Sequence, residues 1–368
     1  MSPIDAVRQA DPYPYYASLV AERPFSFDEE LGLWVAAGAR AVDAVLSDPT
    51  LRVRPADAPV PPGIVGTPAG DVFGNLVRMT DGDLHDRLKD VVVTALGRVD
   101  RAQVVKLAAD RAARTERLDE LMFNVPAQVV ATVCGLDDGH SAEAARLIGD
   151  FVRCLPASAT PDDLTAAATA AAALRDLMGP ALDRRSGSLL GDLVRAAEGA
   201  DWHETGPLLA NGIGFLSQTY DATAGLIGNT LLALARHPAP ADLTAFVDEV
   251  VRHDAPVHNT RRFAVAPFRF GDAEVEAGQS VLAVVAAANR DPEVNPDPHE
   301  FRADRADPVV FTFGAGPHGC PGQTLAVAIT VGVVGELLGN GFDAASLPDQ
   351  VDYRPLPNIR IPVLSVAS

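Results

Sequence analysis

The stretch FTFGAGPHGCPGQTLA, residues 311–326, places a cysteine in a glycine-rich turn just before an apolar segment. Gly314, Gly316 and Gly319 have the G-x-G-x-x-G spacing of a phosphate-binding loop. Cys320 precedes an expected helix N-terminus, where the helix dipole and the unpaired amides favour a thiolate over a thiol. A buried structural cysteine in a glycine turn is the third interpretation.

A dinucleotide site needs a strand, a glycine turn and a helix within a βαβ unit, with an acid ending the second strand. VVFTF and QTLAVAITVGVVGELL could supply the strand and the helix, but GNGFDAASLPDQ follows and contains no apolar strand. Pro317 and Pro321 also restrict the backbone where free amides would be needed. The residues disfavour an NAD-type site and leave a reactive and a structural cysteine as alternatives.

The segment FGAGPHGCPG resembles the haem-binding signature of the cytochrome P450 family, F-G-x-G-x-H-x-C-x-G. Other segments resemble the family in the same order: TDGDLHDRLKDVV its C-helix, YDATAGLIGNTLLALARHP its long I-helix, EVVR its E-x-x-R motif, and ANRDP with PDPHEFRADR its meander. The resemblance covers nearly the whole chain. It implies a mainly α fold with a small β region, in which the I-helix and the helix after the cysteine loop sandwich haem b.

The resemblance also implies roles for the matched residues. Cys320 is expected to be the axial iron ligand, because a thiolate pushes electron density toward the iron. Buried haem propionates require cationic partners. The residues expected to bind the cofactor are His85, Lys89, Arg262, Phe313, Gly314, His318, Cys320 and Gly322. Lys89 stands where the family usually has arginine, so a point charge replaces a bidentate fork.

Glu249 and Arg252 lie at i and i+3 of a predicted helix. A surface ion pair is the ordinary interpretation of that spacing and contributes little stability. The resemblance implies instead a buried pair, joined by Arg305, which supports the cysteine loop.

The I-helix motif of the family reads A-G-x-(D/E)-T, and residues 218–222 read QTYDA in its place. The acid is kept, and the alcohol is replaced by Ala222. A hydroxyl one turn earlier, a water held by the glutamine or a hydroxyl of the substrate could complete the proton relay. A threonine directly after Ala222 lies about 100° further round the helix. The catalytic candidates are Asp221, Thr219, Gln218 and Thr223.

Val257, His258 and Asn259 follow the E-x-x-R helix and are expected to face the haem edge in the substrate pocket. His258 and Asn259 indicate a substrate with polar groups, although a solvent-facing loop would explain them equally well.

The implied function is that of a soluble bacterial-type enzyme that activates O2 to oxidise a small organic molecule. The sequence ends 48 residues after Cys320, so electrons are expected from a separate ferredoxin or flavodoxin. The alternatives are a non-oxygenating oxidation, such as coupling, desaturation or ring closure, and a haem-binding sensor or carrier.

Composition agrees with such an enzyme. The 368 residues are 48% hydrophobic and carry a net charge of −19, which argues against a nucleic-acid partner. Cys134, Cys154 and Cys320 form no paired pattern, which suits a reducing cytoplasm. We find no signal-peptide core and no uncharged apolar run of roughly 18 residues, so no membrane association is expected.

These residues must be positioned by one domain, residues 1–368, that is mostly helical. We expect a long proline- and glycine-rich loop over residues 51–80, because turn-forming residues dominate it. The predicted β-rich part covers about 24–37 and 257–285 with C-terminal strands, and the predicted helical part covers about 83–255 and 320–338.

Overall fold

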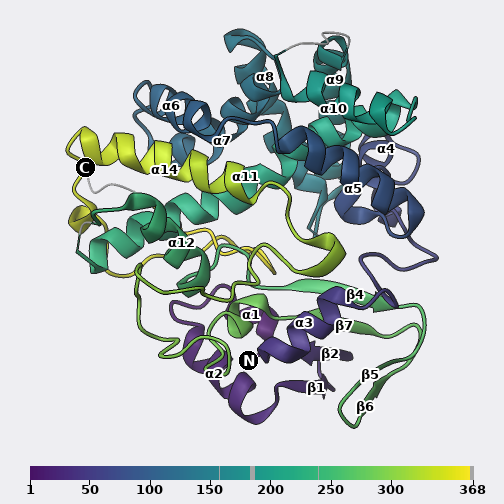
Figure 1. Cartoon of the computed structure of the whole chain (residues 1–368), viewed down its shortest axis with the longest axis vertical. Coiled ribbons are helices and arrows are strands. Elements are labelled where there is room, and N and C mark those ends of the chain that lie inside the picture. Colours follow the sequence, from purple (N-terminus) through teal and green to yellow (C-terminus); the bar gives the residue numbers. More distant parts are fainter. Residues whose placement is uncertain (157, 183–186, 239, 365–368) are drawn as a thin grey trace. The chain divides into compact units, whose positions relative to one another are not determined.

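The computed structural model describes residues 1–156, 158–182, 187–238 and 240–364 (Figure 1). The chain is mainly helical with a small β region, as predicted. Its described residues form two compact units, each discontinuous in sequence, whereas a single domain remains the prediction from sequence. Unit 1 comprises residues 1–56, 225–320 and 338–368, and unit 2 comprises residues 57–224 and 321–337.

Unit 1 contains a five-stranded sheet in the order β1-β2-β7-β4-β3, with β5 and β6 as a separate hairpin. Within the sheet β2 pairs parallel with β7, and the other neighbours are antiparallel. The strands are β1 Phe25–Asp28, β2 Leu33–Ala36, β3 Leu51–Arg52, β4 Thr260–Ala264, β5 Phe268–Phe270, β6 Ala273–Val275 and β7 Ser280–Ala283.

The predicted C-terminal strands are wrong. The described residues near the C-terminus form only isolated bridges, Val257 with Ile359 and Tyr353 with Pro362. The segment RPLPNIRIP carries three prolines, and proline cannot donate a hydrogen bond to a neighbouring strand.

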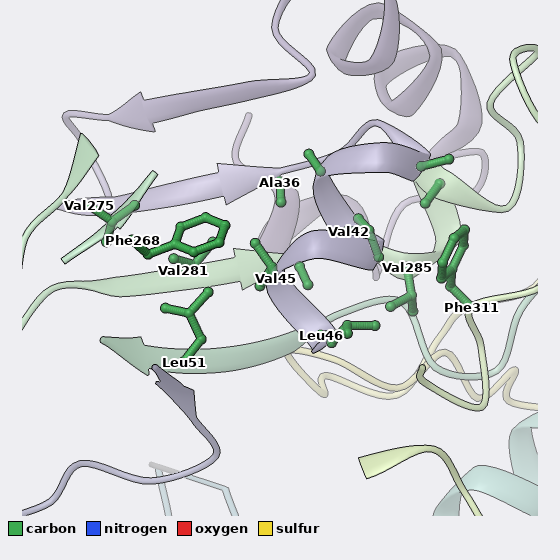
Figure 2. Packing of buried hydrophobic residues seen from close by; sticks show 14 of the residues in the cluster. Ala36, Val42, Val45, Leu46, Leu51, Phe268, Val275, Val281, Val285 and Phe311 are labelled. Atoms are coloured by element: carbon green, nitrogen blue, oxygen red, sulfur yellow. The ribbon is translucent and has the colours of Figure 1, made fainter. Parts of the chain in front are cut away.

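The core of unit 1 lies between its sheet and helix α3, Ala39–Ser47. In Figure 2, Val42, Val45 and Leu46 of α3 lie over the strands, with Phe311 at one end of the cluster. Because the sheet buries this face, the strand residues that point toward α3 are apolar. The other helices wholly within unit 1 are α1 Pro3–Ala6, α2 Tyr13–Glu22, α12 Leu243–His253 and α13 Val285–Ala288.

Unit 2 is built almost wholly from helices, as the alanine- and leucine-rich sequence predicts. Several begin at a side-chain cap, for example Asp100, Asp137 and Ser188, which accept hydrogen bonds from amides of the first turn. The helices are α4 Pro68–Gly74, α5 Asp83–Leu96, α6 Arg101–Ala112, α7 Leu118–Val133, α8 Asp138–Phe151, α9 Pro161–Leu182 and α10 Leu189–Gly199, with most of α11 Thr205–Arg236 and of α14 Gln323–Gly339.

The predicted loop over residues 51–80 contains a helix that the sequence analysis missed. The hydroxyl of Thr67 accepts a hydrogen bond from the amide of Gly70, and Pro68 occupies the first turn of α4. Proline is compatible with that position because its missing amide hydrogen would have no helical partner there. The stretch is therefore a loop interrupted by a capped helix.

One described segment, residues 316–339, is long and apolar enough to cross a membrane, with a mean hydropathy of 1.5. This is weak evidence for a membrane span, because the core helix of a soluble protein or a signal sequence meets the same criteria. Most of this segment is α14, in which residues such as Leu325, Ala328 and Val333 are buried.

Candidate functional site

The cysteine loop of unit 1 is closed by hydrogen bonds of its own backbone. The amide of Cys320 donates to the carbonyl of Phe313 at 2.7 Å, and the amide of Gly314 donates to Phe311 at 2.8 Å. The intervening residues include a short 3-10 turn, Gly316–His318. Cys320 is held at a defined place on the rim of the loop, with its side chain exposed.

Gly316 explains why part of this loop must be glycine. Its φ of +60° lies in the left-handed region, and a Cβ at this position would lie 2.9 Å from the carbonyl oxygen of Leu46 and 2.9 Å from the Cα of Ser47. Both neighbours are backbone atoms at the end of α3, so they cannot move aside cheaply. The loop is thus packed directly against α3.

The other two cysteines have a different environment. Cys134 and Cys154 are buried, and burial raises the pKa of Cys134 to about 12 and that of Cys154 to about 11. A buried thiol of this kind is chemically inert. Cys320 is the cysteine of this chain whose side chain is open to a ligand.

The structure brings Glu249, Arg252 and Arg305 together in unit 1. Arg252 donates to both carboxylate oxygens of Glu249, at 2.6 and 2.8 Å, and Arg305 Nε donates to the same carboxylate at 3.1 Å. The side chains of Glu249 and Arg252 are 2% and 0% exposed, so this pair is buried. The two arginines also donate to backbone carbonyls of the irregular segment after α13. These hydrogen bonds attach that segment to α12.

Two residues that the sequence analysis did not single out connect this network to the cysteine loop. Asn289 accepts a hydrogen bond from the amide of Phe311 at 2.6 Å and donates to the hydroxyl of Thr312 at 2.7 Å. The Thr312 hydroxyl donates in turn to the carbonyl of Val251 in α12. The backbone is therefore fixed immediately before Phe313. Asn289 lies in the ANRDP segment, which resembles part of the meander of the family. This match was the signal from which a structural role of Asn289 could have been predicted.

Unit 1 also holds two of the cations predicted to bind the cofactor. Arg262 lies on β4 and is 5% exposed, and its Nη1 donates to the hydroxyl of Thr260 and the carbonyl of Arg261. His318 is half-buried within the loop that carries Cys320.

Unit 2 holds the other two predicted cations on α5. The side chain of His85 is 4% exposed, and its Nδ1 lies 3.0 Å from Oδ1 of Asp86. Lys89 is half-buried one turn further along the helix, where residues at i and i+4 share a face.

The middle of α11 differs from the rest of that helix. Residues 210–217 and 223–232 are all buried, whereas the five residues 218–222 are all half-exposed. These five residues are the ones aligned with the I-helix motif, and they include Asp221 and Ala222. The helix is therefore accessible at its middle, where the resemblance expects chemistry.

The three remaining candidates on α11 are not equivalent. The hydroxyl of Thr219 donates to the carbonyl of Phe215 at 2.7 Å, so its proton is already used within the helix. Thr223 is 1% exposed, and no hydrogen-bond partner for its buried hydroxyl is found among the described residues. The amide nitrogen of Gln218 lies 3.0 Å from the point where a Cβ on Gly214 would lie. Gln218 is thus folded back along the helix.

His258 has a different environment from the one expected. It is fully buried, its Nδ1 lies 2.8 Å from the hydroxyl of Tyr16, and its ring packs against Tyr13. Burial lowers the pKa of His258 to about 3, so the ring is neutral. The solvent-facing alternative is wrong, and this side chain is enclosed by the aromatic residues of α2 rather than directed at a substrate.

The neighbours of His258 lie beside the C-terminal segment. Val257 bridges to Ile359, and the side-chain Nδ2 of Asn259 donates to the carbonyl of Pro357 at 2.9 Å. The exposed fraction of Asn259 is 4%, which also excludes a solvent-facing loop. Of the three residues predicted for the pocket, Val257 has the more accessible side chain.

Known proteins resemble this chain over most of its length. The sequence profile of the family described as "Cytochrome P450" matches residues 243–340. Cytochrome P450 monooxygenase PikC of Streptomyces venezuelae is 30% identical over 382 aligned positions, which cover 95% of this chain and 89% of PikC. Beta-dihydromenaquinone-9 omega-hydroxylase of Mycobacterium bovis is 26% identical, over 92% of this chain and 72% of that protein.

Solved structures share the fold at lower identity. The crystal structure of CalO2 superposes with a TM-score of 0.84 and 24% identity, covering 99% of this chain and 97% of CalO2. P450BioI, solved in complex with an acyl carrier protein ligated to hexadec-9Z-enoic acid, gives a TM-score of 0.81 at 21% identity, covering 96% of this chain and 97% of P450BioI.

Proposed function

The chain belongs to the cytochrome P450 family and is a P450 enzyme, and we propose that it binds haem b through Cys320 and uses O2 to oxidise a small organic molecule. The observation that carries this proposal is the exposed Cys320 thiol on a backbone-closed glycine loop. The buried ion-pair network of Glu249 stabilises the segment that leads into this loop. The chain has three cysteines, an odd number with no paired spacing, which agrees with a reducing cytoplasm.

The residues present fit a haem. A single exposed thiol can supply the axial ligand, and Gly314 and Gly316 leave the loop without side chains that would obstruct a flat ring. Phe313 would pack beside the sulfur. The cations proposed to pair with the propionates are His85, Lys89, Arg262 and His318.

When bound, a haem would supply the redox chemistry that activates O2, because a thiolate ligand donates electron density to the iron. The chain's own contribution on α11 is to deliver protons. Asp221 is half-exposed at the accessible middle of α11 and is the proposed proton donor. The Thr219 hydroxyl can accept a hydrogen bond there, but its proton is directed at Phe215.

The substitution at Ala222 favours a second candidate function. With an alanine at this position, the relay depends on Gln218, on Thr219 or on the substrate itself. A non-oxygenating oxidation, such as coupling, desaturation or ring closure, relaxes the need for strict proton delivery. In either case the proposed electron donor is a separate ferredoxin or flavodoxin.

Replacing Cys320 tests the central assignment. The reduced wild-type protein should give the red-shifted Soret band of thiolate ligation under carbon monoxide, and Cys320→Ala should lose it completely, because no other exposed thiol is available. Cys134→Ala is the matched control and should keep the band. A thiolate band in Cys320→Ala would exclude Cys320 as the ligand.

Replacing Asp221 tests the proposed proton route. Asp221→Asn keeps the size of the side chain and removes the acid, so product formed per electron consumed should fall about 100-fold, the lower end of the range for general acid catalysis. Ala222→Thr should leave this ratio unchanged or raise it. Full coupling in Asp221→Asn would mean that protons arrive by another route.

A further inference from the structure

A side-chain clasp in unit 2 attaches the segment after α4 to α11. The amide of Val77 donates to Oδ1 of Asn211 at 2.9 Å, and Nδ2 of Asn211 donates to the carbonyl of Asn75 at 2.8 Å. The same Nδ2 donates to Pro207 in α11 at 2.9 Å. Asn211 therefore uses both amide protons and its oxygen, and it binds the backbone on both sides of Leu76.

Gly214 receives the side chain that this clasp presents. A Cβ at position 214 would lie 2.7 Å from Cδ2 of Leu76 and 3.0 Å from Nε2 of Gln218. Leu76 is 3% exposed and fills the space over the glycine. The Gln218 amide and the Leu76 side chain therefore both pack over Gly214, and Asn211 fixes the backbone around Leu76.

These residues lie along one face of α11. Positions 211, 214 and 218 follow the i, i+3, i+7 spacing, and 221 and 222 continue it. Asn211 is 1% exposed, and accessibility begins at Gln218. Among the described residues, none forms a hydrogen bond with the side-chain amide of Gln218. Gln218 therefore presents a side-chain amide that has no described protein partner, one turn before Asp221.

We propose that Gln218 selects substrates that carry a carbonyl or hydroxyl group, and that Asn211, Leu76 and Gly214 are its positioning residues. This inference rests on the proposed function, because it assigns the accessible middle of α11 to substrate binding. The substrate is then a mostly apolar molecule with an oxygen-bearing group that bonds the Gln218 amide. A fixed amide discriminates strongly, because a ligand without the matching group leaves it unpaired on burial.

The first measurement is hydrogen exchange, which needs no turnover. In Asn211→Ala the exchange of the Val77 amide should accelerate at least tenfold, because its acceptor is removed. Gln218→Met should leave that rate unchanged. If Asn211→Ala does not fold, Asn211→Ser provides the same comparison. An unchanged rate in a folded Asn211 variant would overturn the positioning role.

The second measurement is the binding of azole probes, followed by the Soret shift of the holoprotein. The probes are 4-phenylimidazole and its three monohydroxylated isomers. At least one isomer should bind the wild-type protein fivefold or more tightly than the parent compound. That preference should fall to within twofold in Gln218→Met, Asn211→Ala and Gly214→Ala.

Gly212→Ala is the matched control on the same helix. A Cβ at position 212 would lie 2.7 Å from Cδ2 of Leu190, as close as the contact at Gly214, but in the core packing against α10. This variant should keep the hydroxyl preference.

The results distinguish the selecting role of Gln218 from the positioning role of Asn211, Leu76 and Gly214. No preferred isomer in the wild type, or a preference that survives in Gln218→Met, would overturn the selecting role. A preference lost in Gln218→Met but intact in Asn211→Ala and Gly214→Ala would overturn the positioning role. A wild-type protein without thiolate-bound haem would refute the proposed function, while the exchange rate of Val77 would still decide what Asn211 holds.

Discussion

Unit 1 buries arginine, aspartate and glutamate side chains, whereas the buried polar side chains described in unit 2 are hydroxyls, the Asn211 amide and the His85 imidazole. The backbone explains the contrast. The helices of unit 2 satisfy their own amides and carbonyls, so close packing of small residues is sufficient. Much of unit 1 is irregular, and its buried carbonyls need donors from elsewhere.

Arginine meets this need because it offers five donors in a fixed geometry. Arg252 donates to three carbonyls of the meander, and Arg305 also donates to three. Arg360 donates to the carbonyls of Val7, Gln9 and Ala10, so it binds the C-terminal segment to the N-terminal one. The contrast predicts that unit 1 is sensitive to changes of charge and unit 2 to changes of volume.

The largest effect is expected for the buried ion pair of unit 1. Glu249→Ala should lower the free energy of unfolding by about 3–5 kcal/mol, because Arg252 and Arg305 lose their shared partner while Arg252 stays buried. Denaturant titration and haem content measure the effect. Glu249→Gln keeps an acceptor oxygen for the arginines and should lose less stability than Glu249→Ala. Normal stability in Glu249→Ala would show that the network is solvated in solution.

Unit 2 should respond to added volume instead. A Cβ at Gly332 of α14 would lie 2.4 Å from the carbonyl oxygen of Val105 and 2.7 Å from the Cβ of Ala108. Gly332→Ala should therefore cost up to about 3 kcal/mol by forcing the helices apart. Gly199 of α10 has no neighbour within 4 Å and is followed by an alanine, so Gly199→Ala should instead gain about 0.5 kcal/mol from helix propensity. Equal melting temperatures in the two variants would contradict the contrast.

Acid should weaken unit 1 through His258. Its pKa is about 3 in the folded chain and about 6.5 when unfolded, so below pH 6.5 the unfolded state binds the extra proton. The neutral His258 ring therefore stabilises the fold above pH 6.5, and this stabilisation is lost as the pH falls. At pH 5 the free energy of unfolding should be about 2 kcal/mol lower because of this group. Glutamine does not titrate in this range. Between pH 7 and pH 5 the stability of His258→Gln should therefore fall by about 2 kcal/mol less than that of the wild type. A drop as large as that of the wild type would point to another group.

Prediction from sequence succeeded where the signal is local. The helix α14 was expected nearly at its observed bounds, and the second half of α11 lies in the segment that resembles the I-helix of the family. The cysteine loop was recognised from the spacing of its glycines and Cys320. The helix α4 was missed because its prolines and glycines indicated a loop, although Thr67 is a cap.

Prediction failed where a side chain depends on distant partners. His258 was expected in a substrate pocket, but its hydrogen-bond partner Tyr16 lies 242 positions away in the chain. The hydrogen-bond partners of Asn211 are also distant in sequence, since Val77 and Asn75 are 134 and 136 positions away. Nothing in the residues around either side chain indicates these partners.

The sequence by itself determined the family and the order and type of most elements, and it predicted Cys320 as the cysteine that binds a metal. These follow from residue types at short spacings, where backbone geometry leaves few choices. Only the tertiary structure decided that Glu249 is shared by two arginines, that His258 is enclosed, and that Leu76 and Gln218 meet at Gly214. Those contacts depend on burial and on which distant segments come together, and a side chain's chemistry changes with both.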